Sequence, residues 1–171
     1  MVSLTIAYAL HVLSAAFWTG ATLYVAYAIL PDARRDRLPA RVFVDSIHRL
    51  LLITRWTGVV LPITGAYLIW ELYTPLEALT TTVRGWAVLS MLGLWGMMNG
   101  AIELGVLRMR RSIEDIGFGR FMTEGFPAEA LRGEPTAAEF AVAVRPYILA
   151  SAVCAVLLLI NAALLAGGIP F

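Results

Sequence analysis

The sequence predicts an all-α membrane protein, folded as an antiparallel bundle of four transmembrane helices. Hydrophobic residues make up 60% of its 171 residues, well above the roughly 45–50% that is usual in soluble domains. They gather in four long apolar runs, each longer than the ~20 residues needed to cross a hydrocarbon layer of about 30 Å. Each run also carries a narrow polar stripe, which is costly in lipid and is therefore expected to face the bundle. The runs cover residues 4–30, 47–70, 86–107 and 147–168.

The first run, residues 4–30, is predicted to be a retained helix. It has no basic start, and no small-residue cleavage pattern follows its long apolar core, so it does not resemble a signal peptide. His11, Ser14 and Trp18 recur at the spacing of one helical face. This face is expected to point into the bundle.

The second run, residues 47–70, contains Arg55 near its middle and His48 near its start. A central arginine costs about 2.5–3.5 kcal/mol on insertion scales, so it needs a partner. Glu103 and Asn99 on the third run are the candidates. His48 lies beside a basic connection and is expected to be an interfacial residue.

The third and fourth runs each present a polar stripe that matches the other. On the third run the stripe recurs every four residues, and on the fourth it follows one helical face. The members are Met91, Trp95, Asn99 and Glu103 on the third run, and Tyr147, Ser151, Cys154, Leu158 and Asn161 on the fourth.

The charges predict how the bundle is oriented. All thirteen basic residues are arginine, and they concentrate in the first and third connections. Because short Arg-rich loops stay in the cytoplasm, both termini are expected outside the cell, with the bundle in the plasma membrane. The third connection, residues 108–146, is the long one. Its part from residue 111 to residue 126 is either an amphipathic helix on the inner surface or a loop with scattered apolar anchors.

Helical rise assigns each polar side chain a depth. His11, Thr64, Met91 and Asn161 are each roughly 10 Å from the outer surface and are predicted to share one layer. Trp18, Arg55 and Cys154 lie near the middle. His11 and His48 lie at opposite depths, roughly 25 Å apart, so the two histidines are not expected to hold one metal.

Several of these side chains are candidate metal ligands. His11 supplies an imidazole, Met91, Met97 and Met98 supply thioethers, and Cys154 supplies a thiol. Soft sulfur together with imidazole suits Cu(I). Methionines at helical spacing are also common as flexible core residues, so both interpretations stay open.

The first run, with His11 followed by Trp18, Thr19 and Gly20, resembles the CopD family of copper-resistance membrane proteins and the related HemJ-type haem proteins. On the second run, Arg49 precedes Thr64 and Gly65 at the spacing of CopD-like helices. The resemblance implies a four-helix unit that handles copper or binds b-type haem through His11. HemJ-type proteins carry a lysine on the third helix where this chain has Ser90, so protoporphyrinogen oxidation is not carried over.

Three functions follow from this sequence. In the first, the protein handles copper, as Cu(I), at or across the membrane. His11 and Met91 form an outer copper site, and Cys154, Met97 or Met98 provide ligands deeper in the bundle. In the second, it is a b-type haem protein with His11 as axial ligand, Met91 or nothing opposite, and Arg84 paired with a propionate. In the third, it is a cofactor-free accessory subunit whose polar stripes, including Asn99, Asn161 and Trp18, only lock the bundle.

The expected partners are the lipid bilayer and either a homo-oligomer or a larger membrane complex, with no nucleic acid. No nucleophile–base pair and no nucleotide-binding loop is evident, so the sequence does not predict an enzyme.

Overall fold

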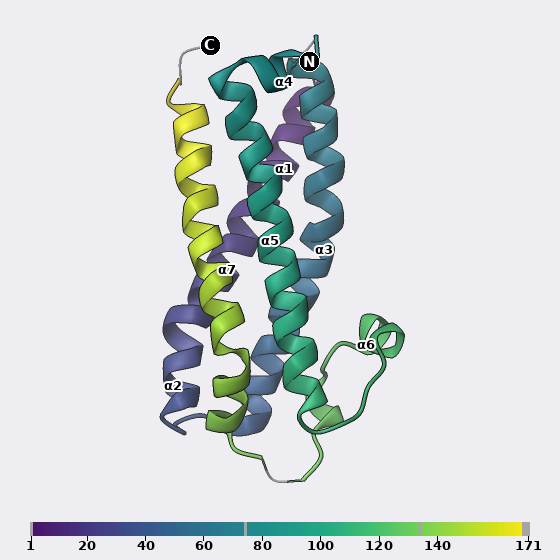
Figure 1. Cartoon of the computed structure of the whole chain (residues 1–171), viewed down its shortest axis with the longest axis vertical. Coiled ribbons are helices and arrows are strands. Elements are labelled where there is room, and N and C mark those ends of the chain that lie inside the picture. Colours follow the sequence, from purple (N-terminus) through teal and green to yellow (C-terminus); the bar gives the residue numbers. More distant parts are fainter. Residues whose placement is uncertain (1, 74, 134, 169–171) are drawn as a thin grey trace.

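The protein is a bundle of four long antiparallel helices (Figure 1). Its computed structural model describes residues 2–73, 75–133 and 135–168. In chain order the elements are α1 (Val2–Tyr24), the π-helical turn η1 (Val25–Ile29), α2 (Leu30–Arg34), α3 (Ala40–Leu72), α4 (Ala78–Thr81), α5 (Val83–Arg111), α6 (Phe118–Glu124), the 3-10 turn η2 (Ala128–Ala130) and α7 (Ala137–Ala166).

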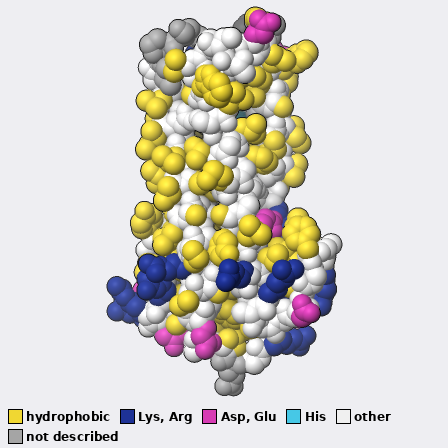
Figure 2. All heavy atoms as spheres, in the orientation of Figure 1, with side chains coloured by type: hydrophobic (Ala, Val, Ile, Leu, Met, Phe, Trp, Pro, Cys, Tyr) yellow, Lys and Arg dark blue, Asp and Glu magenta, His cyan; other side chains and the backbone are white. Residues whose placement is uncertain are grey.

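The four long helices identify a multi-pass membrane protein. The continuous helix Val2–Arg34 and helices α3, α5 and α7 are each long and apolar enough to span a bilayer. The start of α1, helix α4 and the end of α7 lie at one end of the bundle (Figure 1). Arginine side chains gather toward the other end, where α2 and α6 lie (Figure 2). We call this second end the Arg-rich end.

The helices begin earlier or end later than the apolar runs predict. The first helix continues through η1 into α2, where Pro31 occupies the first turn. Pro31 has no backbone N–H and cannot donate to the Tyr27 carbonyl. Just before it, the backbone forms a π-helical turn, in which the Leu30 N–H donates to the Val25 carbonyl, five residues earlier. Helix α7 starts at Ala137 because Thr136 and Glu139 form a capping box. Both additions lengthen the bundle at the Arg-rich end.

The third connection is therefore shorter than predicted. Helix α5 continues to Arg111, so the connection covers residues 112–136 rather than 108–146. The predicted amphipathic stretch contains one short helix, α6, with Phe118 and Met122 exposed and Phe121 buried. This is an amphipathic helix of seven residues, much shorter than the stretch from residue 111 to residue 126.

Fully buried side chains are concentrated at the Arg-rich end. Phe43, Ile47, Met109, Phe121 and Phe140 are each no more than 2% exposed, because the third connection folds over the helices there. The first half of α5, by contrast, is mostly half-buried or exposed. Its apolar side chains are available to lipid.

Close helix approaches occur at two glycines. A Cβ added at Gly105 of α5 would lie 2.7 Å from Cβ of Tyr147 on α7, so these helices meet where a side chain has no room. A Cβ at Gly65 of α3 would lie 3.3 Å from Cε1 of His11 on α1. The His11 ring thus packs directly over the backbone of α3.

Candidate functional site

His11 lies between α1 and α3 with its ring held by a threonine. Its Nδ1 is 2.8 Å from Oγ1 of Thr64, and the same Oγ1 is 2.7 Å from the Val60 carbonyl. The hydroxyl has one hydrogen. When that hydrogen is donated to the carbonyl, Oγ1 accepts from Nδ1–H of His11 and Nε2 keeps its lone pair. When it is donated to the ring, Nδ1 is the acceptor and Nε2 carries the proton.

The first of these tautomers is the one that a metal-ligating histidine needs. Such a ring almost always donates its second N–H to an acceptor, which fixes the tautomer and the ring orientation. The sequence predicts Thr64 in the same layer as His11, and Thr64 makes the hydrogen bond to the ring.

Trp18 makes a second side-chain contact between α1 and α3, deeper in the bundle. We call the interface of these two helices a seam. Its indole Nε1 donates to Oγ1 of Thr54 at 3.0 Å, and the Trp18 side chain is only 1% exposed. Thr54 in turn donates to the Leu50 carbonyl. The seam between α1 and α3 is thus polar at two levels, and Trp18 has a structural role.

Helices α5 and α7 form the second polar seam. Asn161 donates to the Ala87 carbonyl at 3.0 Å and contacts Oγ of Ser90 at 2.6 Å. Together with the approach of Gly105 to Tyr147, this contact fixes the register of the two helices. Asn161 binds α5, so it does not reach His11.

The register places two sulfur atoms at one level. Met98 lies two turns from Gly105 along α5, and Cys154 lies two turns from Tyr147 along α7. Both are on the faces where the helices meet, and both are buried, Met98 at 0% and Cys154 at 5% exposure. Met91 lies two turns further along the same face and is half-buried. Met97 is 64% exposed and points away from this seam.

The predicted outer layer therefore exists as two pairs. The Arg55–Glu103 and Gly58–Asn99 contacts set the register of α3 with α5. In this register Thr64 lies within about one helical turn of the level of Met91. His11 pairs with Thr64, and Asn161 with Ser90 beside Met91. The described hydrogen bonds do not link one pair to the other.

Arg55 forms a two-point ion pair with Glu103. Its Nε and Nη2 donate to the two carboxylate oxygens at 2.8 and 3.1 Å. The guanidinium also donates to the carbonyls of Met122 and Phe121 on α6, at 2.8 and 3.2 Å, and lies over the Phe121 ring. The pairing with Glu103 was predicted. The contacts with α6 were not, and they bring the charged group to the Arg-rich end rather than to the middle of the bundle.

Asn99, the other predicted partner, does not contact Arg55. Its amide donates to the Trp95 carbonyl at 3.1 Å within α5, and its Oδ1 faces Gly58 of α3. One turn further along α5, the indole Nε1 of Trp95 is buried without a hydrogen-bond acceptor among the described residues. A buried N–H without an acceptor costs about 1–3 kcal/mol, so Trp95 marks a place where a polar group would be stabilised.

Residues 118–126, which we call the strap, are tied down by two further side chains. Arg110 of α5, only 1% exposed, donates to the Gly125 carbonyl and forms ion pairs with Glu114 and Glu124. Nδ1 of His48 accepts from the Phe126 N–H at 3.3 Å. Gly125 packs against the His48 ring with a φ of +65°, where a side chain would be strained.

The sequence does not predict the Arg110 network. Arg110 is one of three arginines in the last turn of α5, and only its burial separates it from its neighbours. Arg120 completes the network by pairing with Glu114 and Glu124, both at 2.7 Å. The hydrogen bond from Arg110 lowers the pKa of Glu114, and that from Arg120 lowers the pKa of Glu124.

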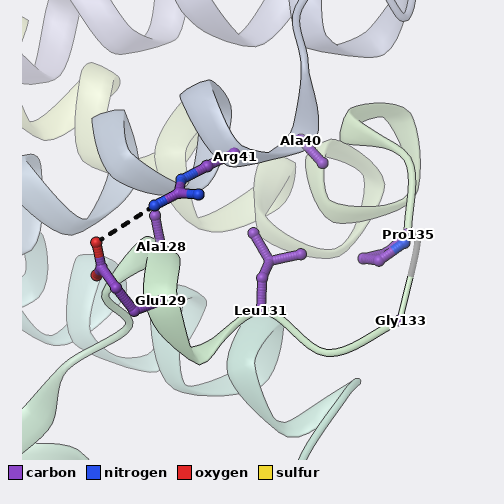
Figure 3. Close-up of a pocket in the computed structure, with 7 residues that line it drawn as sticks. All are labelled: Ala40, Arg41, Ala128, Glu129, Leu131, Gly133 and Pro135. Atoms are coloured by element: carbon purple, nitrogen blue, oxygen red, sulfur yellow. Dashed lines mark ion pairs between the residues drawn. The ribbon is translucent and has the colours of Figure 1, made fainter.

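Two surface hollows lie at the Arg-rich end, away from His11. One, of about 320 Å³, lies between the start of α3 and the end of the third connection. The exposed pair Arg41–Glu129, 3.7 Å apart, borders it (Figure 3). It contains no predicted site residue. The other, of about 300 Å³, lies between α2 and α7.

The donor set fits a soft metal better than a hard one. Among the described residues no group of three or more His, Cys, Asp or Glu side chains could hold a metal ion. What the bundle offers is one imidazole and the sulfurs of Met91, Met98 and Cys154, which are the ligand types of Cu(I). Arg84 lies half-buried in the first turn of α5, at the end opposite the Arg-rich end.

Comparison of the chain with models of known protein families, with curated proteins and with solved structures found no match.

Proposed function

We propose that this multi-pass membrane protein handles copper, as Cu(I), in the half of the bundle opposite the Arg-rich end. The observation that carries the proposal is the 2.8 Å hydrogen bond between His11 Nδ1 and Thr64 Oγ1. In the tautomer with its hydrogen on Nδ1, this bond leaves Nε2 as the donor atom. The ring packs over Gly65.

Buried sulfur on the other two helices extends the site inward. Met98 and Cys154 lie level with each other between α5 and α7, about 10 Å further in than Met91 at 1.5 Å per residue. Copper held first by His11 with Met91 would find softer ligands along this seam. The proposal covers binding and handling at the membrane, with both termini outside the cell and the Arg-rich end in the cytoplasm.

A b-type haem bound through Nε2 of His11 is the second candidate. It is favoured by the Trp95 indole N–H, which is buried without an acceptor among the described residues and would gain one from a cofactor carrying carboxylates. Copper is preferred because thioether and thiol groups line the α5–α7 seam, and a haem needs at most one of them.

The test is the metal and haem content of purified protein and two histidine variants. Copper-loaded wild-type protein is dialysed against buffer without copper and analysed for metal, and its absorption spectrum is recorded. We expect His11→Ala to lose copper and His48→Ala to retain it, because His48 binds the strap at the other end of the bundle. A Soret band lost in His11→Ala would favour haem. Equal copper content and equal absorption spectra in all three proteins would contradict both cofactor proposals and favour an accessory subunit without a cofactor.

A further inference from the structure

The hollow between α2 and α7 combines two arginines with an apolar wall. Arg34, in the last turn of α2, and Arg145 of α7 line it together with Val142, Pro146 and Leu149. Its volume is about 300 Å³, which is enough for a small polar headgroup. Both guanidinium groups come from helices packed side by side, so the charges are brought together by the tertiary fold.

These two arginines differ from six others at the Arg-rich end. Arg55, Arg110 and Arg120 each form an ion pair with a carboxylate, and Arg37, Arg41 and Arg49 each lie within 4 Å of one. Within residues 2–73, 75–133 and 135–168, neither Arg34 nor Arg145 has an ion-pair partner, and both are exposed. Two positive charges beside one hollow without a carboxylate favour an anionic ligand.

The surface next to the hollow is suited to an acyl chain. Leu149, Val153, Val156 and Ile160 follow one face of α7 from the hollow toward the far end, and all are 39–60% exposed. On the face shown in Figure 2, arginine side chains form a band below the apolar surface. A molecule with a negative headgroup in the hollow would lay its chain along this stripe, in the direction of the membrane.

We propose that the hollow between α2 and α7 binds an anionic phospholipid, whose phosphate lies between Arg34 and Arg145 and whose acyl chain follows Leu149 and Val153. Arginine recognises phosphate oxygens through paired, charge-assisted hydrogen bonds. Basic pockets between transmembrane helices at the inner leaflet suit such headgroups. The site is separate from His11 and does not depend on copper.

The test is native mass spectrometry of the delipidated full-length protein with phosphatidylglycerol or phosphatidylcholine of identical chains. We expect phosphatidylglycerol to bind with clear preference, and the double variant Arg34→Gln/Arg145→Gln to weaken that binding roughly thirtyfold. The control variant Arg35→Gln/Arg132→Gln removes the same charge from exposed residues outside the hollow and should bind like the wild type.

A second measurement uses wild-type protein only, so it does not depend on how the variants fold. Phosphatidylglycerol with a photoactivatable chain should label residues 149–160 of α7. The proposal is overturned if the control variant loses as much binding as the site variant, or if phosphatidylcholine binds equally well. It is also overturned if the label is found elsewhere, or if inorganic phosphate alone displaces the lipid at equal concentration, since the hollow would then be a free-phosphate site.

Discussion

Arg55 on α3 binds both carboxylate oxygens of Glu103 on α5 and, with the same guanidinium, two carbonyls of α6. One side chain thus joins two spanning helices to the third connection. Both side chains are about one-fifth exposed, so the pair is partly shielded from solvent. Ion pairs in this setting contribute through the cost of leaving one partner alone.

Arg55→Leu is therefore expected to lower the free energy of unfolding by about 3–5 kcal/mol, the cost of breaking a buried pair. The double variant Arg55→Leu/Glu103→Leu should recover part of this loss, because no carboxylate is left alone. It should not recover all of it, since the Phe121 and Met122 carbonyls still lack their donor. Reversible unfolding in mixed micelles gives the values for Arg55→Leu, for Glu103→Leu and for the double variant. Arg49→Leu, which removes an exposed i,i+4 pair, should cost under about 1 kcal/mol. Simple additivity of the two single changes would disprove the coupling.

The His48 ring holds the strap through the Phe126 amide. Replacing His48 with Leu removes the acceptor from a buried N–H, which costs about 1–3 kcal/mol. Hydrogen exchange of residues 118–126 should become faster, while α5 and α7 keep their protection. Ser46→Ala, a change two residues before His48 at a hydroxyl that donates to the Val42 carbonyl of its own helix, serves as the control. Unchanged exchange of the Phe126 amide in His48→Leu would show that the ring does not hold it.

Glycine positions on α5 differ sharply in what they tolerate. Gly105→Ala places a methyl group 2.7 Å from Cβ of Tyr147, so α5 and α7 must separate, at a cost of roughly 1–3 kcal/mol. Gly100→Ala meets nothing within 4 Å and should be neutral or stabilise by up to about 1 kcal/mol through helix propensity. Thermal unfolding of both variants in detergent checks the contrast. Equal destabilisation would contradict the α5–α7 register from which Met98 and Cys154 are placed opposite each other.

The ion-pair network of the strap predicts a dependence on pH. The pKa values of Glu114 and Glu124 are lowered by hydrogen bonds from Arg110 and Arg120. A carboxyl group with a lowered folded-state pKa stabilises the fold above its unfolded value, about 4.3, and loses that contribution as pH falls through the folded value. Proteolysis of the strap should therefore increase below about pH 4. The variant Glu114→Gln/Glu124→Gln should be cut readily at neutral pH and show little further change on acidification. A strap equally resistant at every pH would exclude this role for the network.

Helical period and rise predicted the levels of the polar side chains better than their partners. Thr64 was placed level with His11, and Glu103 within reach of Arg55, because rise per residue fixes position along a helix axis. The direction of each side chain around the axis depends on how neighbouring helices pack, which the sequence pattern does not specify. For this reason the pattern predicts Asn161 in one layer with His11, whereas its side chain binds α5.

The third connection was the least predictable part. Arg110 is one of several arginines in a charged segment, yet it is almost fully buried. The fold of residues 118–126 also depends on Arg55 and His48, which are distant in sequence. The hollow between Arg34 and Arg145 could not be predicted either, because it requires α2 to pack beside α7. The sequence also does not distinguish Gly105 from Gly100, since only their packed neighbours differ.

The central claim, that Nε2 of His11 is a copper ligand, is tested most directly by X-ray absorption at the copper edge of the Cu(I)-loaded protein. The account predicts imidazole scattering together with sulfur neighbours in the wild type. The imidazole signal should disappear in His11→Ala and remain in His48→Ala. Thr64→Val, which removes the hydroxyl that orients the ring, should weaken copper binding by about 10–100-fold while leaving the ligand type unchanged. The same imidazole signal, at the same copper content, in wild type and His11→Ala would contradict the claim.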